Sequence, residues 1–468
     1  MSLPNQIHPF HVVGAGSQYQ VARSLRFRKS NSAYLSRTPS GAGNRQTWTW
    51  SGWVKFASIV STDYPTLFMG GATQSDTGAL RIGIGTNNLV VQGYNTNFIV
   101  SSQVFRDPSA WYHILIAFDT TQATASNRLK AYVNGTQITA FGTDNRASLT
   151  QNTNYGINQA ALHRIGYESA TFGSTYSDFY LGEINFIDGQ ALTPSSFGTT
   201  DSVTGAWIPT RYTGTYGTNG FYLPFSDNSG ATATTIGKDS SGNGNNWTPS
   251  GISVTAGTTN DSLVDSPTSY GSDTGVGGEA RGNYCTINPL RKSASIAISN
   301  GNLYIDGNSG SVQWESIAST FLVKTGKWYF EFLVSSTYAA GNHMVGLARE
   351  DVNWSSSGQH YLTENSATGK ALDQNSTTND VVCVAFDMDL GYAWGTKNAS
   401  LGTNPTNGLS PDATFSTAYY WGPAFSMVYG RNNTGWANFG QRPFAYTAPS
   451  GFKALCTQNL PTPTIGLY

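Results

Sequence analysis

The chain has 468 residues, only 11% of them charged, and its 26 basic and 27 acidic residues give a formal net charge of −1. At roughly 100–200 residues per domain, this length predicts more than one unit, each with a core of its own. The charge balance argues against electrostatic capture of nucleic acid or of a lipid surface. Aromatic residues make up 13% of the chain, a composition typical of a β protein with an uncharged surface and not of a disordered chain.

The first residues, the apolar runs and the cysteines indicate further which classes of protein the sequence does not fit. The first 20 residues lack a basic segment followed by an apolar one, so we expect no secretory signal there. No apolar run approaches the roughly 18 residues that cross a bilayer, so we expect no membrane insertion. The chain has three cysteines, Cys285, Cys383 and Cys456. Because their number is odd and they lie far apart in the sequence, a disulfide framework and a zinc ribbon are excluded.

Strand signals dominate the first half of the chain. Residues 47–56 alternate apolar and polar side chains, which predicts a strand with two different faces. Residues 111–118 are apolar on both faces and suit an inner strand. Asn134 and Gly135 together are a strong hairpin signal, and residues 179–187 supply a closing strand.

The amino-acid composition changes between about residues 226 and 284, which are rich in glycine, serine and asparagine. Apolar residues such as Trp247 and Leu263 predict that much of this connector is pinned along a domain. Strand patterns return further on, for instance at 328–334 and 381–388.

The predicted fold is all-β, with two antiparallel β-sandwich domains of jelly-roll type joined by the connector. The expected boundaries are an N-terminal arm at 1–22, a first sandwich at 23–225, the connector at 226–284, a second sandwich at 285–455 and a C-terminal tail at 456–468.

Both sandwiches resemble known families. The runs WTWSGWVKF (48–56), WYHILIAFD (111–119) and YLGEINFIDGQALTPSSFG (180–198) resemble the laminin-G-like, concanavalin-type fold over roughly residues 23–225. The runs GKWYFEFLV (326–334) and ANFGQRPF (437–444) are similar to a SPRY domain over roughly residues 285–455. With the segment DSSGNGNNW (239–247), this combination resembles tail-fibre and other appendage proteins of bacteriophages. The resemblance implies that the leading arm attaches to the virion.

Aromatic residues outside the core are the candidates for ligand contact, because sugar recognition stacks a ring against the sugar beside hydrogen-bonding groups. Strand patterns assign several aromatics to the core: Trp50, Trp328, Phe330 and Trp394. The ligand-binding candidates are Trp53, Trp354, His360 and Tyr361. Trp53 points away from the face of Trp48, and the other three lie in a polar loop, where binding residues are common. An oligomer interface or local packing is the alternative for each.

One acidic pair raises the alternative of catalysis. Concanavalin-type glucanases carry Glu-x-Asp-x-x-Glu on a strand, and the nearest match places Glu183, Asn185 and Asp188 at these positions. Asn185 cannot supply the charge that separates two carboxyl pKa values. The segment also fits an ordinary closing strand, so we expect no catalytic residue and no enzyme.

Two segments carry weak metal signals. Asp239, Asn243 and Asn245 place oxygen ligands around a glycine-containing turn that could bind calcium, although a single carboxylate favours a plain Asx turn. His8 and His11 could share a metal across a symmetry axis, with a mobile polar arm as the alternative. We therefore predict no cofactor and keep calcium as the alternative.

These observations predict a non-enzymatic virion protein, assembled in the host cytoplasm and released by lysis. Its expected role is that of a tail-fibre or appendage adhesin that binds a host-surface glycan or protein. A homo-oligomer follows from the need for avidity, and a trimer is what the family resemblance implies. The alternative is a structural decoration or connector subunit that binds other virion proteins.

Overall fold

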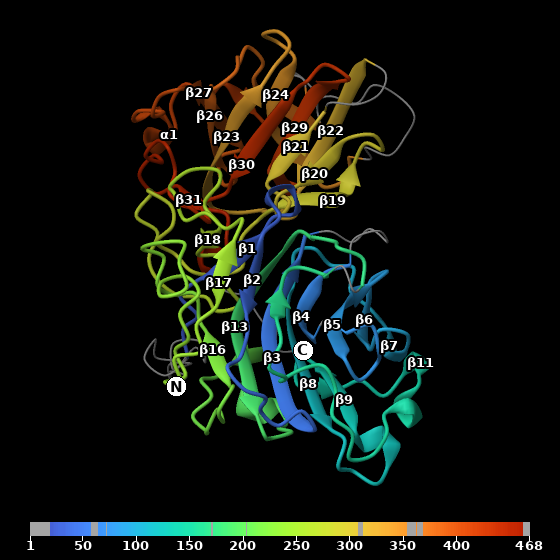
Figure 1. Cartoon of the computed structure of the whole chain (residues 1–468). Coiled ribbons are helices and arrows are strands. Elements are labelled where there is room, and N and C mark those ends of the chain that lie inside the picture. Colours follow the sequence, from blue (N-terminus) through green and yellow to red (C-terminus); the bar gives the residue numbers. More distant parts are fainter. Residues whose placement is uncertain are drawn as a thin grey trace, which may run out of the picture.

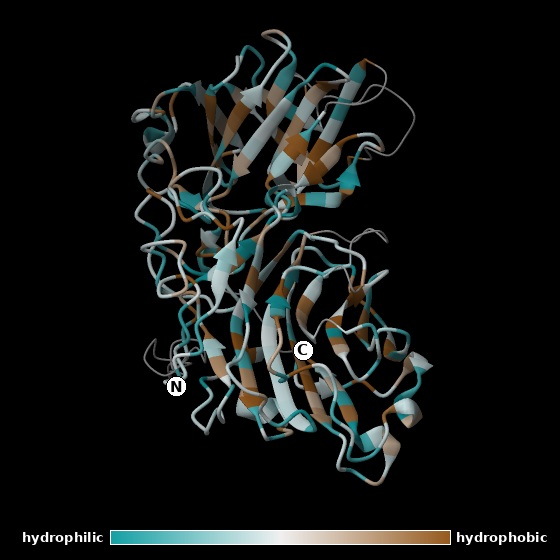
Figure 2. Cartoon of the chain, viewed as in Figure 1, coloured by the Kyte–Doolittle hydropathy of each residue, from teal (hydrophilic) through white to brown (hydrophobic). Residues whose placement is uncertain are grey.

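The computed structural model describes residues 19–57, 64–71, 73–169, 172–202, 204–307, 312–352, 362 and 368–461. Two sandwich units stand one above the other, the C-terminal unit at the top of Figure 1 and the N-terminal unit below it. Hydrophobic and hydrophilic residues alternate along their strands (Figure 2). The predicted all-β fold of two antiparallel sandwiches is thus confirmed.

Two eight-stranded sheets build the N-terminal unit. The first sheet runs in the order β10 (Thr136–Gln137), β9 (Leu129–Val133), β8 (Trp111–Asp119), β3 (Thr47–Phe56), β13 (Phe179–Asp188), β1 (Ser24–Phe27) and β18 (Ser262–Leu263), with β16 (Phe221–Leu223) beside β13. The second sheet runs in the order β11 (Phe141–Asp144), β7 (Asn97–Val104), β6 (Asn88–Gln92), β5 (Ala79–Gly85), β4 (Thr66–Gly71), β12 (His163–Ile165), β2 (Tyr34–Arg37) and β17 (Thr248–Ser250).

The C-terminal unit pairs a five-stranded sheet with an eight-stranded one. The third sheet runs in the order β19 (Ile287–Lys292), β22 (Gln313–Ser319), β29 (Trp421–Tyr429), β24 (His343–Arg349) and β25 (Gly369–Asp373). The fourth sheet runs in the order β20 (Ala297–Ser299), β21 (Tyr304–Asp306), β30 (Thr434–Asn438), β23 (Lys327–Ser336), β26 (Val381–Asp387), β27 (Tyr392–Lys397) and β28 (Ala413–Thr414), with β31 (Lys453–Ala454) parallel to β23.

Short elements complete the chain. A two-stranded sheet pairs β14 (Gly198–Thr200) with β15 (Trp207–Pro209). The helices are α1 (Asn404–Asn407) and the 3₁₀ turns η2 (Lys29–Asn31), η3 (Ala125–Asn127), η4 (Arg146–Ser148), η5 (Pro194–Ser196) and η6 (Thr457–Asn459). Within the described ranges, none of the helices has the length and apolar character to cross a membrane.

The alternation predicted for 47–56 is confirmed in β3. Trp48 and Trp50 are fully buried between the first and second sheets, where the Trp48 ring stacks on Phe118 at 4.8 Å. The predicted hairpin is also present, because Asn134 (φ 47°) and Gly135 (φ 79°) join β9 to β10. Positive φ at both positions gives the turn a twist that matches paired strands.

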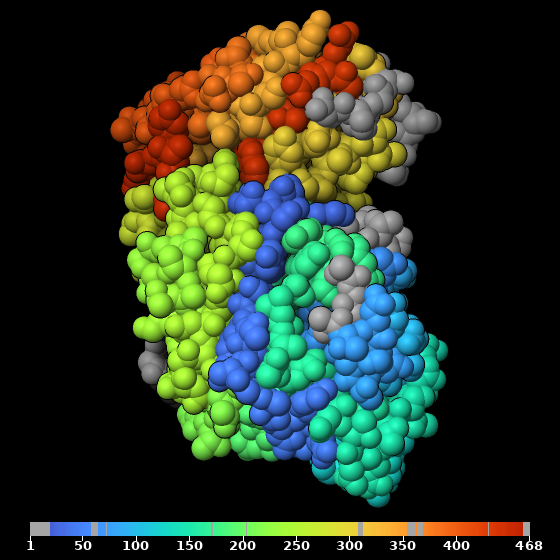
Figure 3. Space-filling model, in the orientation of Figure 1, coloured from blue at the N-terminus to red at the C-terminus, as the bar shows by residue number. Residues whose placement is uncertain are grey.

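The connector is packed against both units. Its Trp247 lies in the core of the N-terminal unit, and its strands β17 and β18 pair with β2 and β1. Further along, Val264 and Ala280 pack with Tyr329 on the outer face of the fourth sheet. Figure 3 shows this segment as a lime-coloured band along the side of the molecule. The two sandwiches are thus joined by a segment that belongs to both.

A buried polar cluster joins the outer face of the first sheet to the connector. Lys55 Nζ donates to Asp265 Oδ2, Asn283 Oδ1 and the Tyr284 carbonyl oxygen, each at 2.8 Å. The indole Nε1 of Trp111 donates to the other oxygen of Asp265 at 3.0 Å. Lys55 and Asp265 are both fully buried, so each charge depends on the other for compensation.

The three thiols are expected to be unreactive in the folded protein. Cys285, Cys383 and Cys456 are free and fully buried. Burial raises the pKa of Cys285 to about 11 and those of Cys383 and Cys456 to about 12, so almost no thiolate is present at pH 8. Titration with a thiol reagent at pH 8 should therefore detect no thiol before denaturation and three after it. Prompt labelling of the native protein would contradict this packing.

Candidate functional site

A cavity of about 460 Å³ lies between the connector and the outer face of the fourth sheet. Its volume falls within the range of small-molecule sites. Its walls come from three segments that are distant in sequence: the connector loop, strands β23, β26 and β30, and the turn that follows β30. The lining residues are Ala256, Gly257, Thr258, Thr259, Glu331, Leu333, Val381, Trp436, Asn438, Arg442, Pro443, Phe444 and Ala445.

Strand pairing places the floor of the cavity on one face. Glu331 lies opposite Asn438 and Leu333 lies opposite Trp436 across β23 and β30. Because side chains alternate along a strand, the intervening Phe332 points the other way and is buried in the core. The floor therefore combines a carboxyl group, an amide and an indole ring on a rigid sheet.

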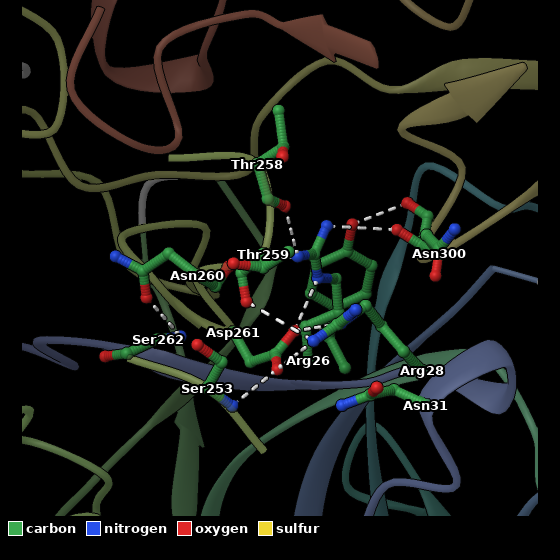
Figure 4. Close-up of polar contacts among 12 residues, drawn as sticks. Arg26, Arg28, Asn31, Ser253, Thr258, Thr259, Asn260, Asp261, Ser262 and Asn300 are labelled. Carbon is green, nitrogen blue, oxygen red and sulfur yellow. Dashed lines mark hydrogen bonds and ion pairs between the residues drawn. The ribbon is translucent and has the colours of Figure 1, made fainter. Parts of the chain in front are cut away.

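Two buried arginines hold the connector loop that forms one wall (Figure 4). Arg26, in β1, donates from Nη2 to the carbonyl oxygens of Thr258 at 2.9 Å and Asn260 at 3.0 Å. Its Nε and that of Arg28 both donate to Asp261 Oδ1, at 3.1 and 2.7 Å. Charge-assisted hydrogen bonds between buried groups are strong. The wall is thus fixed in place before any ligand arrives.

The same arginine also reaches the C-terminal unit. Arg26 donates from Nη1 to the carbonyl oxygen of Asn300 at 3.1 Å, as Figure 4 shows. Its guanidinium carbon lies 5.8 Å from the ring centre of Trp436. Arg26 therefore links the connector wall to the floor of the cavity.

Glu331 positions the turn that follows β30. Its carboxylate accepts hydrogen bonds from the backbone N–H groups of Ala445 and Tyr446, both at 2.8 Å, and from the Tyr329 hydroxyl at 3.1 Å. Burial raises the pKa of Glu331, while these hydrogen bonds act in the opposite direction. Its carboxylate is thus occupied by the protein itself.

Arg442 is the least satisfied polar residue of the cavity. Its side chain is only 3% exposed, and Nη2 donates to the carbonyl oxygen of Ala437 at 2.9 Å. Its Nη1 is buried without a hydrogen-bond partner among the described residues. Burial, reinforced by the charge of Arg26, lowers the pKa of Arg442 to about 9, which still leaves it charged at neutral pH. A buried donor without an acceptor carries a substantial free-energy cost.

Of the four residues expected to bind ligand, the structure describes Trp53, which does not line this cavity. Trp53 is 4% exposed, belongs to a hydrophobic cluster that includes residues of both units, and contacts the His113 ring at 5.2 Å. The second unit covers the face of the strand that carries it, so Trp53 packs in the interior and offers no ring to a surface ligand. The position of Trp53 thus fits local packing, the alternative to ligand contact. Trp354, His360 and Tyr361 lie outside the described residues, as do His8 and His11.

The acidic pair of the first sheet is split between its two faces. Asp188 lies opposite Trp48 on the core side and accepts from the backbone of Asn44 at 2.8 Å. Glu183 (φ 53°), at a β-bulge, turns to the outer face and accepts from the Tyr222 hydroxyl at 2.9 Å. Two carboxyl groups on opposite faces of a sheet cannot flank one glycosidic bond.

The candidate calcium loop is held by its own hydrogen bonds. Asp239 Oδ1 accepts from the backbone N–H groups of Tyr222 and Ser241, both at 2.8 Å. Its Oδ2 accepts from the Asn245 backbone, also at 2.8 Å. The side-chain nitrogens of Asn243 and Asn245 donate to backbone carbonyls. This pattern is that of an Asx turn, and no cluster of three metal-ligating side chains occurs within the described ranges.

Comparisons with known proteins found weak structural likenesses and no match in sequence. No protein-family model matches it, and neither does any curated protein. The SPRY domain of human HERC1 has 18% identity and a TM-score of 0.24, covering 32% of this chain and 96% of that one. A putative carbohydrate binding protein from Bacteroides ovatus has 15% identity and a TM-score of 0.31, with coverage of 49% and 58%. A heptameric SAP-like pentraxin from Limulus polyphemus has 13% identity and a TM-score of 0.29, with coverage of 41% and 94%. Likenesses at this level establish no function.

Proposed function

We propose that this chain is a non-enzymatic appendage protein of a bacteriophage particle that binds host-surface glycans in the cavity between its connector and its fourth sheet. The observation that carries the proposal is the indole of Trp436, which lies half-buried on a rigid sheet beside polar groups. An aromatic ring with adjacent hydrogen-bonding groups is the arrangement that sugar recognition uses. The preformed walls support this function, because a fixed site loses less entropy on binding.

Avidity would supply the strength that a single small cavity lacks. The proposed assembly is a homo-oligomer, with a trimer as the expected state, which presents several copies to one cell surface. Linked weak sites gain effective concentration without any new contact. Residues 1–22 are proposed to attach the protein to the particle, and Tyr19 and Val21 already bond to the body of the molecule.

Replacing Trp436 with alanine should weaken glycan binding about tenfold or more, because the stacking ring is lost. Binding of the full chain to a glycan array and to host cells provides the measurement. Trp314→Ala is the matched control, since Trp314 is also half-buried but lies in the third sheet. Binding that is equally strong in the Trp436 variant would contradict a role for this cavity. Absence of any glycan or cell binding by the wild-type chain would contradict the function itself.

A second function is favoured by an exposed aromatic patch on the C-terminal unit. Tyr419 and Tyr420 are 37% and 42% exposed, and the Arg349 guanidinium lies 3.9 Å from the Tyr419 ring centre. Tyrosine and arginine are enriched at protein interfaces, so the patch suits a decoration or connector subunit that binds other virion proteins. Two results would favour this second function. Added protein would fail to block adsorption of the phage to host cells, and particles that lack this chain would fall apart.

A further inference from the structure

We infer that the folded chain forms an isopeptide bond within itself, in which Lys55 Nζ replaces the side-chain nitrogen of Asn283. The bond needs no ligand, so the inference goes beyond the proposed function. It joins strand β3 of the first sheet to the end of the connector, across 228 positions of the chain.

The three side chains that such a reaction requires meet in one buried cluster. The amine is that of Lys55, the amide that it attacks is that of Asn283, and the proton carrier is the carboxylate of Asp265. Lys55 Nζ lies 2.8 Å from Asn283 Oδ1 and 2.8 Å from Asp265 Oδ2. Since Oδ1 is bonded to Cγ at about 1.2 Å, Nζ lies no more than about 4 Å from the carbon that it attacks. Reacting groups held this close need no encounter step.

The amide of Asn283 is turned so that its oxygen faces the lysine. Its Nδ2 donates to the carbonyl oxygen of Ser109 at 2.6 Å, which distinguishes the two ends of the amide. The carbonyl oxygen of Tyr284 accepts a further hydrogen bond from Lys55 Nζ at 2.8 Å. Contacts on both partners thus hold the amine against the amide.

The surroundings of the lysine favour an uncharged product. Lys55 and Asp265 are fully buried. The cross-strand neighbours of Lys55 are Trp111 and Tyr180, which are buried as well. Two charges that have lost their contact with water carry a large desolvation cost. Conversion of the ion pair into a neutral amide and a neutral acid removes this cost.

The reaction balances in atoms and in charge. Asp265 takes one proton from the Lys55 ammonium group, which frees the electron pair of Nζ. Nζ then forms a bond to Asn283 Cγ, the bond between Cγ and Nδ2 breaks, and a second proton of Nζ passes to Nδ2. The products are a secondary amide, ammonia and an uncharged Asp265, which acts as the general base of the reaction.

The bond also changes how the chain carries force. A covalent link between distant residues restricts the unfolded chain. Tension between the leading arm and the C-terminal unit enters the loop before Lys55 and leaves it after Asn283. Residues 56–282 therefore lie outside the loaded path, which suits a protein that holds a particle to a cell.

The intact mass of the full chain under denaturing conditions tests the bond. We expect nearly all wild-type molecules to be lighter than the sequence requires by one molecule of ammonia. A tryptic digest should contain a branched peptide that joins Lys55 to Asn283. Lys55→Arg and Asn283→Ala should each restore the full mass and remove the branched peptide. Asp265→Asn should do the same, because the proton carrier is lost.

A second group of the same three residue types supplies the matched control. Lys397 lies 3.4 Å from Asp380, and Asn398 Nδ2 donates to the same carboxylate. Here the lysine is exposed, and Asn398 Oδ1 accepts from the backbone N–H of Val381. Lys397→Arg should therefore leave both the mass deficit and the branched peptide unchanged.

The outcomes are distinct from one another. Full mass in the folded wild-type chain would overturn the inference. A deficit that persists in Lys55→Arg would also overturn it, because cyclisation of another asparagine releases ammonia too. Asn283→Ala keeps the ion pair of Lys55 with Asp265, so it should fold even where the variants at the charged residues do not, as near-UV circular dichroism can check. Glycan binding plays no part in the bond, so failure of either proposal leaves the other standing.

Discussion

Replacing Asp261 with alanine should lower the free energy of unfolding by about 3–5 kcal/mol, the usual cost of removing one partner from a buried ion pair. Asp261 is fully buried and accepts from Arg26 and Arg28. Without it, two buried guanidinium groups lack a counter-charge. Denaturant unfolding followed by tryptophan fluorescence measures the change.

The same substitution should also weaken ligand binding, because Asp261 fixes the arginines that hold the cavity wall. Its Oδ2 further accepts from the backbone of Ser253 at 2.9 Å, at the start of that loop. Asp227→Ala is the control: Asp227 lies in the same connector but bonds only locally to Ser229, so both stability and binding should match the wild type. If the Asp261→Ala variant is as stable as the wild type, other groups must compensate the charges of Arg26 and Arg28.

The sequence predicts the strands well because their signal is local. The alternation over 47–56 separates core from outer side chains, and the runs at 328–334 and 381–388 are confirmed as β23 and β26. The period of two is set by backbone geometry and survives any tertiary context. The alternating pattern does not tell which element of the chain covers the outer face of a sheet.

Trp53 shows the consequence of that gap. Its direction along β3 is predicted correctly, yet its exposure is not. The hydrophobic cluster to which Trp53 belongs includes residues more than 200 positions further along the chain, such as Cys285 and Leu303. The cavity was missed for the same reason. Arg442 and Asn438 lie in ANFGQRPF, one of the runs similar to a SPRY domain, and nothing local in that run shows that a connector loop faces them. The one available signal was Glu331, a single carboxylate inside the apolar strand WYFEFLV.

Stability should fall as the pH rises from about 4.5 to 7, because of Glu183. Its carboxyl group is buried on the outer face of the first sheet, where the hydroxyls of Tyr19 and Tyr222 donate to it at 2.7 and 2.9 Å. Burial raises the pKa of Glu183 from 4.5 to about 7, although these hydrogen bonds and the charge of Arg211 oppose the rise. The folded state therefore retains a proton that the unfolded chain has already lost.

The sign of this effect follows from proton binding. Between the two pKa values the folded state binds more protons than the unfolded state, so increasing the pH favours unfolding, by about 3 kcal/mol in total. Glu183→Gln keeps a hydrogen-bonding group of the same shape and removes the titration. The variant should match the wild type at pH 4 and exceed its stability at pH 8 by about that amount. Denaturant unfolding at a series of pH values measures the slope.

An exposed glutamate separates this effect from general titration of the surface. Glu350 lies on the surface of the C-terminal unit, and Glu350→Gln should retain the wild-type slope between pH 4.5 and 7. Parallel curves for the wild type and the Glu183 variant would mean that Glu183 is ionised throughout this range. In that case the hydroxyls of Tyr19 and Tyr222 outweigh the cost of burying the charge. The comparison therefore decides whether burial or hydrogen bonding controls the carboxyl group that anchors Tyr19 of the leading arm.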